Sequence, residues 1–204
     1  THSTHLRTSV APALTSLHFT WTHSVYRNRV VMNSFHYSIG TQLFMQPHRE
    51  TDARRRATEL YEQAYRLQMN GKVAEAIKYY QLSLETFETS ETHTFLVWAY
   101  SFLGDYQRAI MECFRAIELD PEYGNPYNDV AAYLIYMDKY DEAEYWLLQA
   151  LRAVRYASRH YAYYNVGRVY ERQGKWFKAL SQYQQSVSID PSYTMAALAL
   201  LNLQ

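Results

Sequence analysis

The chain of 204 residues has one cysteine, no net charge and no long apolar run. Its single cysteine, Cys113, excludes an intramolecular disulfide, and we expect it to pack in the core rather than to act as a reactive thiol. The 20 basic and 20 acidic residues cancel, so bulk charge gives no reason to expect nucleic acid as a partner. No run approaches the roughly 18 apolar residues that a membrane span needs, so we expect no such span.

The sequence also lacks the short motifs of common chemistries. It contains no glycine-rich phosphate loop, no Gly-x-Ser-x-Gly elbow and no His-Glu-x-x-His motif. Histidine pairs such as His2 with His5, or His18 with His23, come without cysteine or carboxylate donors, whereas a metal site needs three or four converging donors. We therefore predict no catalytic residue, no metal site and no cofactor, and a protein that is not an enzyme.

Acidic residues are missing from residues 1–49, which contain many Ser and Thr, four Arg and six of the 8 His. This composition, with no sustained periodicity, predicts a largely disordered segment over residues 1–50. A transit peptide, a secretory signal and translated sequence upstream of Met32 are the alternatives for it. Unless this segment directs the chain to an organelle, we expect a cytoplasmic protein.

The chain does contain a short sequence motif that recurs every 33 to 36 residues. Each copy has a Gly or Asp followed five residues later by Ala: Gly71 and Ala76, Gly104 and Ala109, Asp138 and Ala143, Gly174 and Ala179. A period of roughly 34 residues is what a stack of helix-turn-helix units produces. Gly, and less easily Asp, adopts the left-handed conformation that ends a helix, and the small Ala lets two helices cross closely. The sequence therefore predicts four antiparallel helix pairs.

Signals for helix ends agree with this division. Asp120-Pro121 and Asp190-Pro191 are predicted to end two of the second helices, because Pro disfavours the helical conformation at the residue before it. Asp52 is the predicted N-cap of the first helix.

These residues resemble the tetratricopeptide repeat family, in the form found in bacterial proteins, over about residues 53–193. The matching residues are Leu103-Gly104-Asp105-Tyr106, Ala109, Ala116 and Asp120-Pro121 in the second unit, and Val166-Gly167, Tyr170, Gly174, Ala179, Tyr183 and Asp190-Pro191 in the fourth. The resemblance implies an all-α fold, a right-handed α-solenoid of four helix-turn-helix repeats over residues 51–204. The repeats are expected at about 57–89, 90–123, 124–159 and 160–193, with a capping helix over 192–204.

The third unit departs from the family pattern. Arg155 stands where the second and fourth units have Pro, and about two extra residues lie around Tyr156-Ala157-Ser158. The sequence leaves the angle between the third and fourth units open.

In such a solenoid the first helices line a concave surface, so the resemblance predicts a groove for a partner protein. The predicted groove residues are Tyr61, Tyr65, Phe95, Trp98, Phe102, Asn128, Asp129, Tyr136, Tyr161, Tyr164, Asn165 and Arg168. Family members that grip chaperone C-terminal carboxylates use Lys, Arg and Asn here, whereas this chain mainly has aromatic residues, which argues against a chaperone-tail clamp. Tyr and Trp offer large contact areas for few lost rotamers. We therefore predict a non-enzymatic scaffold or adaptor that binds a partner peptide or helix.

Two other functions stay open. The last helix is apolar on most faces, whereas a terminal solenoid unit normally has a polar outer side. A structural assembly factor that forms a homo-oligomer through this helix is one alternative, and Asn125-Pro126-Tyr127-Asn128-Asp129 is distantly similar to bacterial pilus-assembly repeat proteins. A regulatory domain of an enzyme complex is the other. Many tyrosines, such as Tyr100 and Tyr183, can instead serve packing between helices.

Overall fold

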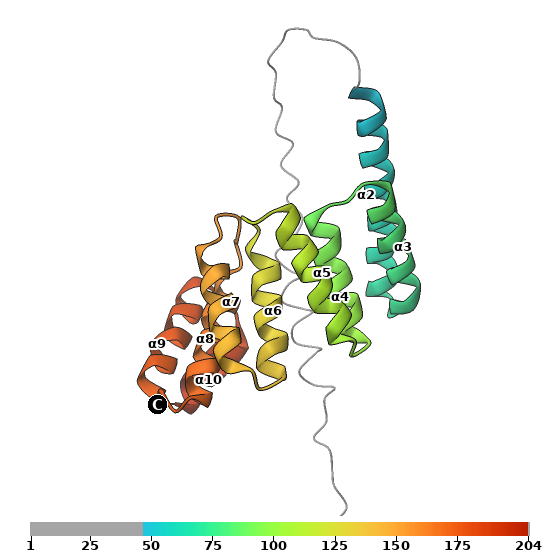
Figure 1. The fold of residues 1–204 in the computed structure, drawn as a ribbon. Coiled ribbons are helices and arrows are strands. Elements are labelled where there is room, and N and C mark those ends of the chain that lie inside the picture. Colours follow the sequence, from blue (N-terminus) through green and yellow to red (C-terminus); the bar gives the residue numbers. More distant parts are fainter. Residues whose placement is uncertain (1–46, 204) are drawn as a thin grey trace, which may run out of the picture. The chain divides into compact units, whose positions relative to one another are not determined.

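The computed structural model describes residues 47–203, and these residues form nine α-helices and no β-strand. The helices are α2 (Pro47–Met69), α3 (Val73–Thr86), α4 (Ser90–Phe102), α5 (Tyr106–Leu119), α6 (Gly124–Tyr136), α7 (Tyr140–Arg152), α8 (Arg159–Arg172), α9 (Trp176–Ile189) and α10 (Thr194–Asn202). Helices α2 and α3, α4 and α5, α6 and α7, and α8 and α9 pack as pairs, and the pairs stack in chain order (Figure 1). The predicted all-α solenoid is confirmed, and we assign one repeat to each pair.

Some predictions concern residues outside this range. The expected disordered segment and the paired histidines within it lie almost wholly among residues 1–46, which the structure does not describe. Across 47–203, no helix combines the length and the apolar character that crossing a membrane requires.

The turn within each pair follows the prediction. Gly71, Gly104 and Gly174 have φ angles of 76°, 74° and 72°, and Asp138 has a φ of 61°. All four residues therefore sit in the left-handed region, where glycine pays no steric penalty and Asp pays a smaller one than most residues. The left-handed turn residue reverses the chain, which brings the second helix back along the first.

Each second helix faces its own first helix with three residues at spacing i, i+4 and i+7. The sets are Ala76, Tyr80 and Ser83; Ala109, Cys113 and Ala116; Ala143, Leu147 and Ala150; and Ala179, Tyr183 and Ser186, and all twelve side chains are buried. A small residue at both ends of each set allows the close crossing that the sequence predicts. Cys113 is one of these core residues, and burial raises the pKa of its thiol well above its ordinary value.

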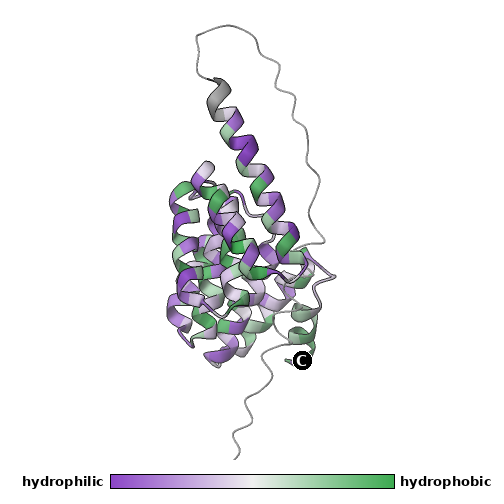
Figure 2. Cartoon of the chain, turned by 90° about the vertical axis from the view of Figure 1, so that its right-hand side faces the viewer, coloured by the Kyte–Doolittle hydropathy of each residue, from purple (hydrophilic) through white to green (hydrophobic). Residues whose placement is uncertain are grey.

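Helix α2 begins earlier than predicted. It starts at Pro47, so the interpretation of Asp52 as its N-cap is wrong. Pro is tolerated in the first turn of a helix, because N–H groups there have no intrahelical acceptor. Asp52 lies inside the helix, where its Oδ1 is 3.2 Å from Nη2 of Arg55 one turn later. Beyond its first turn, the part of α2 that extends past the neighbouring helices is mainly hydrophilic (Figure 2).

The segment between α7 and α8 hydrogen-bonds to the turn between α5 and α6. The N–H of Arg155 donates to the carbonyl of Glu122 (2.9 Å), and the N–H of Gly124 donates to the carbonyl of Arg155 (3.2 Å). Tyr156 is buried against Gly124, where a Cβ would lie 2.4 Å from the Tyr156 Cβ. The Arg155 side chain also donates through Nη1 to Glu91 (2.7 Å). Arg155 in place of Pro thus ties the α7–α8 segment to the α5–α6 turn and to the start of α4.

Candidate partner-binding face

Successive first helices contact one another through their side chains. Helix α2 packs against α4, and α6 packs against α8, as well as against their own second helices. We call the side of the stack where α2, α4, α6 and α8 meet the first-helix face. All twelve predicted groove residues lie on these four helices.

The α2–α4 end of this face is aromatic. The Phe95 ring is buried, and its centroid lies 5.0 Å from Tyr61, 5.8 Å from Tyr65 and 4.8 Å from Trp98. The contacts with the two tyrosines are edge-on, a favoured geometry for aromatic pairs. Phe95 is therefore the centre of a ring cluster, and Tyr61, Tyr65 and Trp98 are half-buried around it.

From Trp98 onward the face becomes a ladder of polar side chains across three helices. Trp98 Nε1 of α4 donates to Asp129 Oδ2 of α6 (2.9 Å), and the neighbouring Asn128 donates to Asp129 Oδ1 at 3.5 Å. Asn165 Nδ2 of α8 donates to Asn128 Oδ1 (3.0 Å), and Arg168 Nη1 donates to Asn165 Oδ1 (3.2 Å). We call these five residues the polar ladder.

Asp129 is the titratable group at the centre of the polar ladder. Burial raises the pKa of its carboxyl group from 3.8 to about 7, because the charged form loses its hydration. The hydrogen bonds from Trp98 and Asn128 act in the opposite direction, since both stabilise the carboxylate, but they only partly offset burial. The carboxyl group is therefore half protonated near neutral pH.

The predicted tyrosines of α8 lie in a different environment. Tyr161 and Tyr164 are both buried, and their ring centroids lie 5.0 Å and 5.3 Å from that of Tyr193 in edge-on contacts. Tyr193 precedes α10, and the predicted groove did not include it. A cue exists, because Tyr193 follows Asp190-Pro191 as Tyr123 follows Asp120-Pro121. These tyrosines therefore form part of the packing between α8 and α10.

The more accessible predicted residues lie at the C-terminal ends of the first helices. Phe102 of α4 is 38% exposed and Tyr136 of α6 is 47% exposed. Each stands two residues before the left-handed turn residue of its repeat, so the two occupy equivalent positions. By the same count Met69 and Arg172 are their counterparts in the first and fourth repeats, and both are exposed. One exposed side chain from each repeat thus forms a row, which we call the terminal row.

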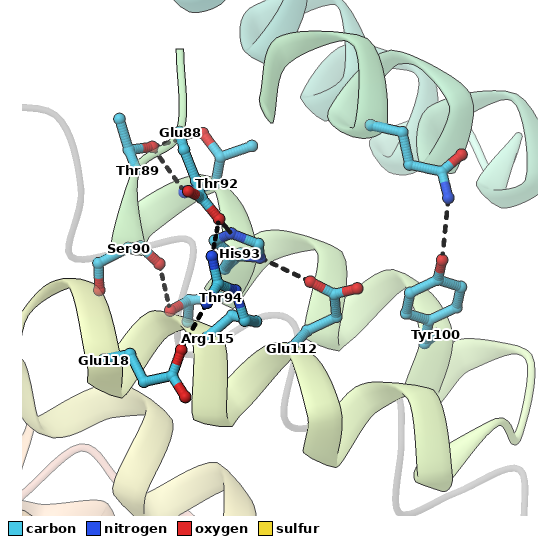
Figure 3. A network of polar contacts seen from close by, with 11 residues as sticks. Glu88, Thr89, Ser90, Thr92, His93, Thr94, Tyr100, Glu112, Arg115 and Glu118 are labelled. Atoms are coloured by element: carbon cyan, nitrogen blue, oxygen red, sulfur yellow. Dashed lines mark hydrogen bonds and ion pairs between the residues drawn. The ribbon is translucent and has the colours of Figure 1, made fainter. Parts of the chain in front are cut away.

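A second polar network lies between α4 and α5 (Figure 3). Nδ1 of the buried His93 is 2.6 Å from Glu112 Oε2, and its Nε2 is 2.9 Å from Glu88 Oε1. Arg115 donates to both Glu88 (2.9 Å) and Glu118 (2.5 Å). The hydrogen bond with His93, and then that from Arg115, lower the pKa of Glu88. This network joins the α3–α4 turn to α5.

The histidine network is not a metal centre. Each ring nitrogen of His93 faces a different carboxylate, so neither nitrogen converges with other donors on one point. In the part of the chain that the structure describes, no group of three or more His, Cys, Asp or Glu side chains could hold a metal ion.

Comparisons with known proteins identify the repeat. Family models of the tetratricopeptide repeat match residues 90–123 and 122–192. No curated protein sequence matches the chain.

Solved structures share the fold. MamA has a TM-score of 0.60 and 23% identity over 72% of this chain and 80% of its own. The Pseudomonas aeruginosa protein PilF has a TM-score of 0.67 and 20% identity, and the match covers 75% of this chain and 68% of PilF. YrrB, described as having an unusual peptide-binding site, has a TM-score of 0.57 and 21% identity, and the match covers 74% of this chain and 76% of YrrB. At these identities the likeness shows the fold alone, for all three proteins.

Proposed function

We propose, from the premise that this chain belongs to the tetratricopeptide repeat family, that it is an adaptor whose first-helix face binds a segment of a partner protein. The fold supports a protein interaction scaffold in general, and proteins of this family are typically non-enzymatic. The peptide-binding site named for the structurally similar YrrB agrees with this role. The partner segment and its contacts are the new part of the proposal.

The observation that carries the proposal is the terminal row. It presents Met69, Phe102, Tyr136 and Arg172, one exposed side chain from each successive repeat. Three of the four are large apolar or aromatic side chains at equivalent positions of successive repeats, and exposed residues of this kind are typical of contact sites. An extended or helical segment that runs across the repeats can contact all four side chains.

The α8 end of the face adds a preference for negative charge. Arg168 and Arg172 stand one turn apart on α8, so their like charges repel each other. The Arg168 guanidinium is also held in place, because it donates to Asn165 (3.2 Å) and lies 5.8 Å from the centroid of the Tyr164 ring. A carboxylate from a partner would relieve this repulsion and form charge-assisted hydrogen bonds. We therefore infer a partner segment with apolar side chains toward α4 and α6 and an acidic residue at α8.

The polar ladder has a supporting role in this proposal. Its hydrogen bonds fix the side chains of Trp98, Asn128 and Asn165 across three repeats, so the face is ordered before a partner arrives. Preorganised contact residues lose less conformational entropy on binding. Tyr161 and Tyr164 support the wall of the face through Tyr193 rather than contacting the partner.

A peptide-display selection tests the proposal. Random peptides are selected on the full chain, and individual peptides are then measured by fluorescence anisotropy against wild type, the double variant Phe102→Ala with Tyr136→Ala, and Leu148→Ala. Leu148 is the matched control, because it is 42% exposed but lies on α7. We expect the double variant to lose at least about tenfold in affinity and Leu148→Ala to lose none, with similar melting temperatures. Peptides that bind the double variant as well as wild type would contradict the proposal.

A charge reversal tests the acidic preference separately. Arg172→Glu, which removes no member of the polar ladder, is expected to weaken the peptides that carry Asp or Glu and to leave uncharged ones unchanged. Equal effects on both classes of peptide would refute the inferred acidic contact while leaving the apolar contact standing.

A further inference from the structure

The two amide side chains of the polar ladder are closed to a partner. Asn128 is 2% exposed and Asn165 is fully buried. Asn128 donates to Asp129 and accepts from Asn165, and Asn165 Oδ1 in turn accepts from Arg168. Both amides therefore use their hydrogen bonds within the first-helix face, and neither is placed to bond the backbone of a bound segment.

Further polar side chains of the first helices are engaged as well. Ser101 Oγ donates to the carbonyl of Trp98 (2.8 Å). Glu171 Oε2 accepts from the Tyr183 hydroxyl (2.6 Å). The backbones of α2, α4, α6 and α8 are helical, so most of their N–H and C=O groups bond to one another. What the face presents to a partner is therefore mainly the terminal row, with its apolar and aromatic side chains and one arginine.

Such a surface suits a helix better than an extended segment. An extended backbone pressed against a protein needs partners for its N–H and C=O groups, and each group left without one costs free energy. Recognition of an added strand accordingly depends on main-chain hydrogen bonds from the receptor. An α-helix bonds its own backbone and contacts the receptor through side chains alone. An amphipathic helix can therefore dock on an apolar row whose neighbouring amides are already engaged.

The stacking of the repeats sets the spacing of the contact residues on this helix. Helices that pack against each other have axes about 8 to 10 Å apart, and Phe102 and Tyr136 occupy equivalent positions in successive repeats. Seven residues of an α-helix, or two turns, advance by about 10.5 Å. A helix lying across the first helices thus meets successive repeats with every seventh residue. A strand, at about 3.3 Å per residue, would meet them with every third residue.

Charge argues that this helix comes from a partner rather than from residues 1–46. Those residues contain no Asp or Glu. The proposed function places an acidic residue at the α8 end of the face, where Arg168 and Arg172 stand one turn apart. Residues 1–46 have no side chain that could meet this requirement.

We propose that the partner segment binds the first-helix face as an amphipathic α-helix lying across the repeats, with large apolar residues at i, i+7 and i+14 and an acidic residue at i+21. These four residues contact, in order, Met69, Phe102, Tyr136 and Arg172. The inference rests on the proposed function and adds the conformation and the residue spacing of the partner. The helix makes one contact with each repeat and is about 22 residues long.

Two peptide libraries separate a helix from a strand. Both are 24 residues long and random except at four positions: one fixes Leu at 1, 8 and 15 and Glu at 22, and the other fixes Leu at 1, 4 and 7 and Glu at 10. Each pattern is made in both chain directions. Peptides selected on the full chain are measured by fluorescence anisotropy against wild type, the double variant Phe102→Ala with Tyr136→Ala, and the control Leu148→Ala. We expect the peptides that the double variant weakens at least about tenfold to come from the first library, and Leu148→Ala to leave them unchanged.

A proline substitution tests the conformation of the selected peptides. At a central position where Ala is tolerated, Pro should weaken binding at least about tenfold, because it removes a helical hydrogen bond and clashes with the preceding turn. The ¹³Cα chemical shifts of the labelled peptide should also become helical when it binds the unlabelled wild-type chain.

Two kinds of failure can be told apart. The inference is overturned, and the proposed function stands, if peptides that need Phe102 and Tyr136 come from the second library, tolerate Pro or have extended ¹³Cα shifts. If the double variant weakens no peptide from either library, the proposed function fails and this inference fails with it.

Discussion

Replacing Asp129 by Asn should change how stability depends on pH. The folded protein holds this proton with a pKa of about 7, whereas an unfolded chain releases it near the ordinary 3.8. Between these two pH values the folded state binds more protons than the unfolded state, so the free energy of unfolding of wild type falls as pH rises. Above about pH 7 the carboxyl group is ionised in both states, and this dependence stops. Asn has nearly the same shape and does not titrate.

The magnitude follows from the size of the shift. Each pH unit within this window lowers the free energy of unfolding of wild type by at most about 1.4 kcal/mol. The same group makes no such contribution in Asp129→Asn, because Asn does not titrate. Over the whole window the upper limit is on the order of 4 kcal/mol, since the shift in pKa spans about three units. The variant should therefore gain stability relative to wild type as pH rises from 4 to 7.

Urea unfolding at closely spaced pH values from 4.5 to 8.5 measures this difference. The free energy of unfolding of wild type is subtracted from that of the variant at each pH. This cancels the titrations that both proteins share, so the remaining pH dependence belongs to residue 129. The expected difference rises up to pH 7 and is then constant. A difference that does not change with pH, or that favours wild type as pH rises, would refute the argument that burial controls this carboxyl group.

Three further substitutions probe the packing of the repeats. Gly167→Ala should lower the free energy of unfolding by about 1 to 3 kcal/mol, because the new Cβ would lie 2.4 Å from the Tyr183 ring, and a reduced urea midpoint would show this. Ala109→Leu should cost a similar 1 to 3 kcal/mol at the fully buried α4–α5 crossing, and an unchanged midpoint would mean that the crossing has spare room. Gly104→Ala should cost about 1 kcal/mol from backbone strain alone, since its φ is 74° and nothing lies within 4 Å of a Cβ there; calorimetry should show a lower melting temperature.

The fold could be predicted because its signals are local. A left-handed turn residue followed by Ala five positions later is a feature of one short segment, and each copy forms the expected turn and buried crossing. The start of α2 was placed wrongly because Asp52 is a good N-cap residue, whereas the helix starts at Pro47 instead. Both Pro and Asp are common at helix starts, and the sequence alone does not show which of two such residues begins the helix.

The site was harder to predict, because it depends on contacts between repeats. The twelve groove residues were placed on the correct helices by aligning the turns, but alignment does not say which of them stay accessible. Trp98 and Asp129 are 31 residues apart, and their hydrogen bond depends on the stacking of two repeats. Burial of Tyr161 and Tyr164 likewise depends on Tyr193, which comes from the next unit. Such contacts depend on how successive repeats stack, and local sequence signals do not specify that stacking.

Site-specific photo-crosslinking with a selected peptide tests most directly whether the first-helix face binds a partner. A photoreactive residue is introduced in place of Phe102, of Tyr136 or, on the opposite helix layer, of Leu148. The account predicts that the peptide crosslinks at positions 102 and 136 and not at 148. Crosslinking at 148, without crosslinking at the other two positions, would contradict it.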